Sequence, residues 1–199
     1  METRSNTREN LVAAARQLVH QRGLYRTSLA EIAQAAGVPL GNVYYHFRTK
    51  ESLVAAVIDG YAQDVCRNFL AWEMASESPL MRLKLFVNSA RDMTEVFARY
   101  GCPHGTLCSE LDGDETDARL AKASSNLLKL HVDWATEQFR LTGNAAPHAL
   151  AVDLVASLQG AYLLANTYRS TELLKTQLGR LDAWVGELAN QHGTSSLGV

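Results

Sequence analysis

Apolar residues recur at intervals of three and four along almost the whole chain, a spacing that places them on one face of an α-helix. The longest such stripe comprises Leu53, Val57, Tyr61, Val65, Phe69 and Trp72. No window alternates with a period of two and β-branched enrichment, so strands are not expected. The prolines stand where helices would begin or end, at Pro39, Pro79, Pro103 and Pro147. The pattern predicts an all-α fold.

The stripes and the residues that break them predict eight longer helices, at about 6–22, 28–37, 40–47, 49–75, 79–100, 114–141, 146–169 and 171–191. Residues 101–114 are expected to form an irregular junction around a short helix. Asp114, Glu115 and Asp117 mark the start of the next long helix, because negative charge is favourable at a helix N-terminus. The tail after His192 is expected to fray.

Residues 27–50 have the pattern of a helix-turn-helix. Ser28 and Glu31 form a predicted capping box at the start of the first helix, and Gly37 allows a tight turn before the second. Ile32, Ala33, Val43 and Phe47 would then pack inside, and the second helix would lie at the major groove of DNA. The same segment could instead be a capped helical hairpin with buried aromatic residues. Its hydroxyl, amide and basic groups favour the DNA-binding reading, since a core needs none of them.

The charge distribution permits DNA binding without requiring it. The 199 residues carry a formal net charge of −2, but residues 1–60 hold seven Lys and Arg against five acidic residues, a local charge of +2. Non-specific affinity for nucleic acid should therefore be weak, and specificity should depend on geometry.

The segment from Thr27 to Leu53 resembles the signature of the tetracycline-repressor (TetR) family, in which T-S-x-x-x-I-A-x-x-A-G-V precedes G-x-x-Y-x-H-F-x-x-K-x-x-L. All of these positions match. The resemblance implies an all-α protein with an N-terminal three-helix DNA-binding domain, expected at 1–50, and a larger helical ligand-binding and dimerisation domain at 51–199. It also implies a homodimer that binds double-stranded operator DNA and releases it when a small-molecule effector, of unknown identity, is bound.

The resemblance also implies roles for individual residues. Thr27, Tyr44, His46 and Lys50 match positions that grip phosphates, while Gly41 and Asn42 match positions that face base edges. Tyr45 could pack inside or approach a thymine methyl group. The expected DNA-binding set is completed by Ser28 and Leu40. Pro39 departs from the family, which often has a capping Ser there; loss of such a cap costs about 1 kcal/mol.

Aromatic and polar residues outside the helix-turn-helix suggest an effector pocket between helices, although for any single one of them the ordinary core is the favoured reading. The candidates are Trp72, Phe86, Met93, Phe97, Cys102, His104, His131, Trp134 and Tyr162.

The junction Gly101–Leu111 resembles a Gly-Cys-Pro-x-Gly-x-Leu motif found in one branch of the family. By that resemblance, the junction connects the effector pocket to the fourth helix. Cys102 stands two residues from His104 and near a helix start, features that can lower a thiol pKa and make it reactive. This leaves open a regulator that responds to electrophiles or to oxidation. Cys102 and Cys108 could instead be small buried apolar residues.

The last two predicted helices carry apolar faces suited to helix packing. By resemblance, these helices from two subunits form a four-helix bundle. The residues expected at the dimer interface are Leu154, Leu158, Ala161, Leu174, Leu178, Leu181 and Val185.

Other classes of protein find less support. A thiol-dependent enzyme would need an oriented base and an oxyanion pocket, so no catalytic residue is assigned. The helix dipole explains the acidic residues at Asp112, Asp114 and Asp117 without a metal, and no cofactor is expected. No uninterrupted apolar run reaches the roughly 18 residues of a membrane span, and the N-terminus lacks the apolar core of a signal peptide. A cytoplasmic protein without membrane contact is therefore expected.

Overall fold

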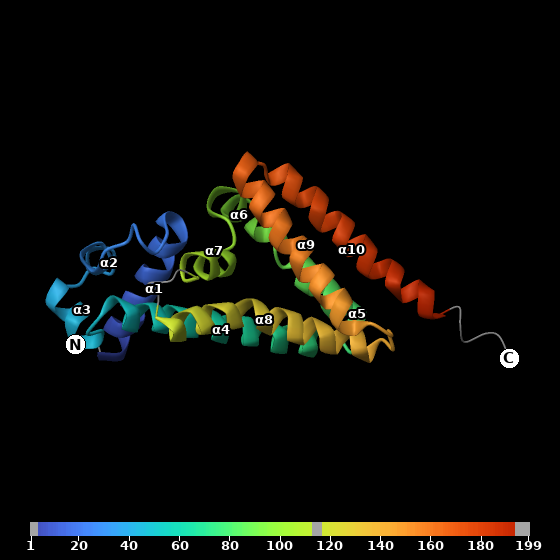
Figure 1. Cartoon of the computed structure of the whole chain (residues 1–199), viewed down its shortest axis with the longest axis horizontal. Helices are drawn as coiled ribbons and strands as arrows, with labels where there is room; N and C mark the ends of the chain where they lie inside the picture. Colours follow the sequence, from blue (N-terminus) through green and yellow to red (C-terminus); the bar gives the residue numbers. More distant parts are fainter. Residues whose placement is uncertain (1–3, 113–116, 194–199) are drawn as a thin grey trace. The chain divides into compact units, whose positions relative to one another are not determined.

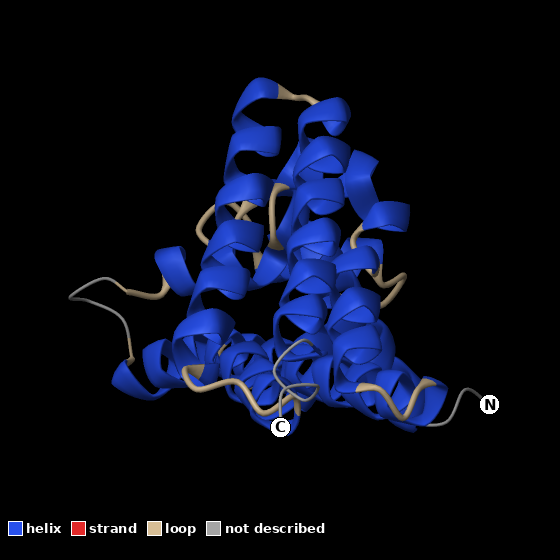
Figure 2. Ribbon diagram, turned by 90° about the vertical axis from the view of Figure 1, so that its right-hand side faces the viewer, coloured by secondary structure: helices blue, strands red, loops and turns tan. Residues whose placement is uncertain are grey.

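The computed structural model describes residues 4–112 and 117–193, and every regular element in these two ranges is a helix (Figure 2). The all-α prediction is confirmed. In chain order the elements are α1 (Arg4–Arg22), α2 (Leu29–Ala35), α3 (Leu40–His46), α4 (Lys50–Ala75), α5 (Pro79–Asn88), the 3-10 turn η1 (Arg91–Met93), α6 (Thr94–Tyr100), α7 (Pro103–Glu110), α8 (Ala118–Leu141), α9 (Pro147–Tyr168) and α10 (Thr171–Gly193). The predicted frayed tail lies largely outside the described residues, as do Asp114 and Glu115.

The chain divides into two compact units. Unit 1 comprises Met1–Asp64 and Pro103–Leu127, and unit 2 comprises Val65–Cys102 and Leu128–Val199. Helices α4 and α8 therefore each contribute their first part to unit 1 and the remainder to unit 2. The sequence predicted a division at residue 50, whereas the two units divide within α4, between Asp64 and Val65. The apolar stripe of α4 continues unbroken through this point and does not mark it.

Unit 1 surrounds one apolar core. Helices α1 to α3, the beginning of α4, α7 and the beginning of α8 all contribute to it. Its most deeply buried members include Leu11, Ile32, Val43, Leu53 and Leu107. Each such side chain contributes about 1.5–3 kcal/mol when it is fully buried. The short α7 is thus part of the same core as the helix-turn-helix.

Unit 2 is built around α9 and α10, which lie side by side (Figure 1) with α5 and α6 packed against them. Phe139 of α8 is fully buried, as are Leu154 of α9 and Leu178 of α10. These three helices therefore share a second core that is distinct from that of unit 1.

The predicted helix over 79–100 is interrupted. Helix α5 ends at Asn88, η1 follows, and α6 begins at Thr94. Side chains at the end of α5 bind carbonyls of their own helix: Asn88 Nδ2 donates to Lys84 O at 2.9 Å, and Ser89 Oγ donates to Phe86 O at 2.7 Å. The structure thus has two shorter helices and a 3-10 turn where the apolar spacing predicts one continuous helix.

Helix α9 is apolar on more than one side. By length and mean hydropathy (1.3) alone it could cross a membrane, and 39% of that window is buried inside the protein. Residues Ala151, Val155 and Tyr162 lie on the buried side, whereas Val152 and Leu163 are 42% and 66% exposed. One apolar face of α9 thus packs in unit 2, and a second faces outward.

Candidate nucleic-acid interface

Helices α2 and α3 form the predicted helix-turn-helix. Gly37 has φ +68°, a left-handed conformation that favours glycine, and Val38 N–H donates to Ala33 O at 3.0 Å across the turn. Ile32 on α2 and Val43 on α3 are both buried in the core of unit 1. Because Ile32 and Val43 face this core, the opposite sides of α2 and α3 remain at the surface.

The predicted capping box is confirmed at the start of α2. Glu31 N–H donates to Ser28 Oγ at 3.2 Å, and Ser28 N–H donates to Glu31 Oε2 at 2.9 Å. The backbone hydrogen bond from Ser28 holds the pKa of the Glu31 carboxyl below its ordinary value, with further help from the Ser28 hydroxyl. Because the folded-state pKa is lowered, this stabilisation is present above the ordinary pKa of a glutamate and is lost as the pH falls through the folded-state value.

Helix α3 presents polar and aromatic side chains to the surface. Tyr44 is 53% exposed and Tyr45 is 67% exposed, while Gly41 and Asn42 are also exposed. His46 is half-buried and meets the Tyr45 ring edge-on, with the ring centroids 5.1 Å apart. Of the two placements that the sequence left open for Tyr45, the structure has the exposed one.

The first turn of α3 forms without a side-chain cap. Pro39 occupies the N-cap position, and its carbonyl accepts a hydrogen bond from Asn42 N–H at 2.9 Å. The proline fixes φ near the value that a helix start requires, which compensates in part for the missing capping hydroxyl. Leu40, the first residue of the helix, is 41% exposed.

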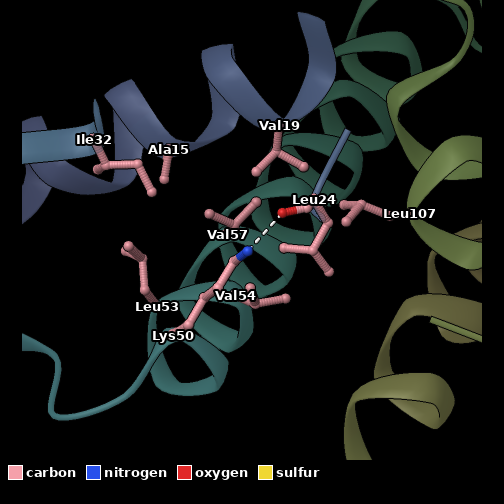
Figure 3. Close-up of a pocket in the computed structure, with 9 residues that line it drawn as sticks. All are labelled: Ala15, Val19, Leu24, Ile32, Lys50, Leu53, Val54, Val57 and Leu107. Carbon is pink, nitrogen blue, oxygen red and sulfur yellow. Dashed lines mark hydrogen bonds between the residues drawn. The ribbon is translucent and has the colours of Figure 1, made fainter. Parts of the chain in front are cut away.

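Thr27 and Lys50 bind the turn between α1 and α2. Thr27 is only 2% exposed, and its hydroxyl donates to Gly23 O at 2.8 Å. Lys50 Nζ donates to Leu24 O at 2.7 Å, and Figure 3 shows the side chain pointing toward that carbonyl. The phosphate contact of Lys50 needs only its remaining donors. A phosphate contact by the Thr27 hydroxyl would require it to break its hydrogen bond to Gly23 O. The phosphate contacts of Thr27 and Lys50 both stay predictions.

The largest group of predicted effector residues lies in an aromatic cluster in unit 2. Trp134 lies parallel to Phe69 with the ring centroids 4.7 Å apart, and Trp72 lies 5.3 Å from Trp134. Phe86 stacks on His131 at 5.5 Å. Four of the nine predicted residues are thereby brought together by α4, α5 and α8: Trp72, Phe86, His131 and Trp134.

A second, smaller cluster holds three more of the predicted residues. The rings of Phe97 and Tyr162 lie 4.5 Å apart, and Cys102 packs at the edge of the same core. Burial raises the pKa of the Tyr162 hydroxyl, and the neighbouring Cys102 thiol raises it further. The hydroxyl therefore stays protonated and available as a hydrogen-bond donor.

The other two predicted effector residues lie apart from these clusters. Met93 is 42% exposed in η1, and His104 meets Tyr61 edge-on in unit 1 with the ring centroids 5.1 Å apart. Cys108, the alternative thiol, donates from Sγ to Ser124 O at 3.1 Å. Among the residues that the structure describes, no three His, Cys, Asp or Glu side chains are grouped as a metal site.

The predicted dimer-interface residues require correction. Leu154, Leu174, Leu178 and Val185 are fully buried inside the chain itself, Leu158 and Ala161 are at most 4% exposed, and Leu181 packs against the same core. These residues hold α9 and α10 against the rest of unit 2, and all of them except the half-buried Leu181 have almost no surface to offer a second chain. The sequence pattern identified a packing face correctly but assigned it to the wrong partner.

Three residues of these sites were missed by sequence reasoning. Phe69 belongs to the aromatic cluster, although its place in the apolar stripe of α4 gave it only a core role. Glu73 accepts a hydrogen bond from Trp134 Nε1 at 2.8 Å. Glu110 accepts one from Leu24 N–H at 2.8 Å. The two carboxylates lie 61 and 86 positions from their partners, so no local pattern could have identified them.

Comparison with known proteins supports the assignment of α2 and α3 as a DNA-binding helix-turn-helix. Residues 11–57 match the family described as bacterial regulatory proteins, tetR family. An HTH-type transcriptional regulator in the lacX 3′ region of Lactococcus lactis subsp. lactis, itself uncharacterized, is 30% identical over 88% of this chain and 91% of its own length. The HTH-type transcriptional repressor DhaR of Mycobacterium sp. strain GP1 is 29% identical over 86% of this chain and 88% of its own length.

A solved structure has the same fold. The crystal structure of regulatory protein TetR from Rhodobacter sphaeroides superimposes with a TM-score of 0.76 at 26% identity, covering 88% of this chain and 96% of that one. The similarity therefore extends beyond the helix-turn-helix to both units.

The capping box yields a stability prediction. Ser28→Ala removes the hydroxyl that accepts from Glu31 N–H and should lower the free energy of unfolding by about 1 kcal/mol. Urea denaturation followed by circular dichroism measures this. The matched control is Ser125→Ala, since Ser125 is exposed within α8 and its hydroxyl only donates back to Lys122 O. Equal stabilities of the two variants would contradict the role of the cap.

Proposed function

Because the chain belongs to the TetR family of bacterial regulatory proteins, and is thus a DNA-binding transcriptional regulator, we propose that it is a homodimeric repressor that a small-molecule effector releases from its operator. The observation that carries the DNA-binding part is the exposed surface of α3. Four exposed residues flank the buried Val43 there: Gly41, Asn42, Tyr44 and Tyr45.

The side chains on α3 suit separate tasks in DNA recognition. The Asn42 amide can donate and accept at once, as the major-groove edge of adenine requires. Gly41 lets the backbone approach closely, while Tyr44 and His46 offer polar groups to phosphates or bases. Lys50, at the N-terminus of α4, would add one ion pair to the backbone of the duplex. Base reading is thus assigned to Asn42 and positioning to Lys50.

The exposed apolar face of α9 supports dimerisation by a second copy of this chain. Val152, Ala156 and Leu163 lie at spacings of four and seven on the side opposite the buried residues, and all three are exposed. Gly160 lies on the same side and would let a partner helix approach closely. An outward apolar face on a helix that is already half-buried is typical of a protein–protein interface.

The aromatic cluster of unit 2 supports effector binding. Its rings come from α4, α5 and α8, and the Glu73 carboxylate is the polar group beside them. Pockets for small molecules are mostly apolar with a few polar groups that fix orientation. An effector that inserts among Phe69, Trp72 and Phe86 would have to displace rings from one another, and this coupling of binding to rearrangement is what release of DNA requires.

Two substitutions separate positioning from reading. A duplex selected by the parent protein from a random pool serves as the operator. Lys50→Ala should weaken binding to the operator and to random duplexes alike, and lower the slope of log affinity against log salt by about one. Asn42→Ala should relax the preference at one base pair, by about 1–3 kcal/mol, with an unchanged slope. Fluorescence anisotropy and repeated selection measure both. An unchanged preferred sequence for Asn42→Ala would contradict its assignment.

The corrected interface predicts opposite outcomes for two leucines. Leu163→Glu places a carboxylate on the outward face of α9 and should give a folded monomer by analytical ultracentrifugation. Leu178→Glu places it in the core of unit 2 and should prevent folding instead. Met74→Glu, at a site that is 89% exposed on α4, is the control and should remain dimeric. A dimeric Leu163→Glu protein would move the interface away from this face.

A further inference from the structure

The backbone of one residue, Leu24, connects α7 to the lysine at the start of α4. The N–H of Leu24 donates to Glu110 Oε2 at 2.8 Å, and the carbonyl of the same residue accepts from Lys50 Nζ at 2.7 Å. Glu110 is the last residue of α7, and Lys50 is the first residue of α4. All three residues belong to unit 1. The backbone of Leu24 therefore lies between an acidic and a basic side chain and bonds to each of them.

The turn that contains Leu24 is fitted closely around Glu110. Gly23 has φ +88°, and a Cβ atom added there would lie 2.4 Å from Glu110 Oε1. Tyr25 adds a further link, because its hydroxyl donates to the backbone carbonyl of Glu110 at 3.0 Å. The residue at the end of α7 is thus held by Leu24 and Tyr25, and Gly23 leaves the room that the Glu110 carboxylate occupies.

We propose that Glu110 is a positioning residue for DNA binding, which fixes the Leu24 carbonyl and thereby aims the Lys50 ammonium at a phosphate of the operator. This rests on the DNA-binding function proposed above. An ammonium has three N–H donors, and the bond to Leu24 O occupies one of them. The other two remain for phosphate oxygens. Holding a flexible lysine in place before binding reduces the entropy lost when the ion pair forms.

The sign of the expected effect separates positioning from simple electrostatics. Glu110 carries negative charge in the unit that contacts DNA, so its removal should strengthen DNA binding if charge alone matters. If Glu110 positions Lys50, the same removal should weaken binding, because the Leu24 N–H loses its charge-assisted hydrogen bond and the carbonyl of the same residue is no longer held in place for Lys50.

The test compares Glu110→Ala with Glu110→Gln in the full-length protein, using the duplex that the parent selects from a random pool. Glu110→Ala should bind about three- to tenfold more weakly and should have a smaller salt slope. Glu110→Gln keeps an oxygen that can accept from Leu24 N–H and should bind at least as tightly as the parent. Glu95→Ala, an exposed glutamate on α6 of unit 2, makes the same charge change and should not weaken binding.

A double substitution checks that the effect passes through Lys50. In the Lys50→Ala background, Glu110→Ala should cause no further loss of affinity and no further change of slope. An additional loss equal to that in the parent would overturn the proposal, as would operator binding by Glu110→Ala as tight as that of Glu95→Ala.

A folding defect in Glu110→Ala must be distinguished from a loss of DNA binding. If thermal unfolding shows that Glu110→Ala does not fold, Glu110→Asp takes its place, since it keeps the charge but withdraws the carboxylate by one methylene. Weaker binding by that variant supports the proposal and parent affinity overturns it. A parent protein that selects no duplex from the pool would refute the proposed function itself. If the parent selects a duplex and the Glu110 variants bind it with the parent's affinity, only the role of Glu110 is refuted.

Discussion

The turn between α1 and α2 is the constraint on which the DNA-binding unit depends. Gly23 adopts a left-handed backbone conformation, and its carbonyl accepts from the buried Thr27 hydroxyl. One residue later, the capping box at Ser28 starts α2. The direction of α2 then determines the placement of α3 across the tight turn at Gly37. An error in this first turn would be carried into every residue that faces DNA.

Local signals made much of this unit predictable. The Ser28–Glu31 pair, the turn glycine Gly37 and the proline at 39 each act within a few residues, and the structure has the helix ends that they indicate. The interruption after Asn88 was not predicted, because the apolar spacing of residues 79–100 suits one continuous helix. The hydrophobic pattern reports which face of a helix packs and not where the backbone leaves the helix, so it did not predict this break.

Contacts between residues far apart in the chain could not be predicted from the sequence, for a different reason. Helix α9 has apolar residues on two sides, and nothing in their spacing tells which side packs in its own chain. Leu158 was expected at the dimer interface and is buried inside its own chain, whereas Leu163, for which the sequence predicted no role, is 66% exposed. The carboxylates of Glu73 and Glu110 find donors far along the chain. Only tertiary packing selects such contacts.

The central claim is that α3 reads DNA as one of two symmetric copies. Hydroxyl-radical footprinting of the parent protein on the duplex it selects tests this most directly. Two identical half-sites related by a twofold axis, with centres about 34–36 Å apart or a multiple of that distance, are the predicted result. Protection of a single asymmetric half-site, with the same affinity as the full duplex, would contradict the account.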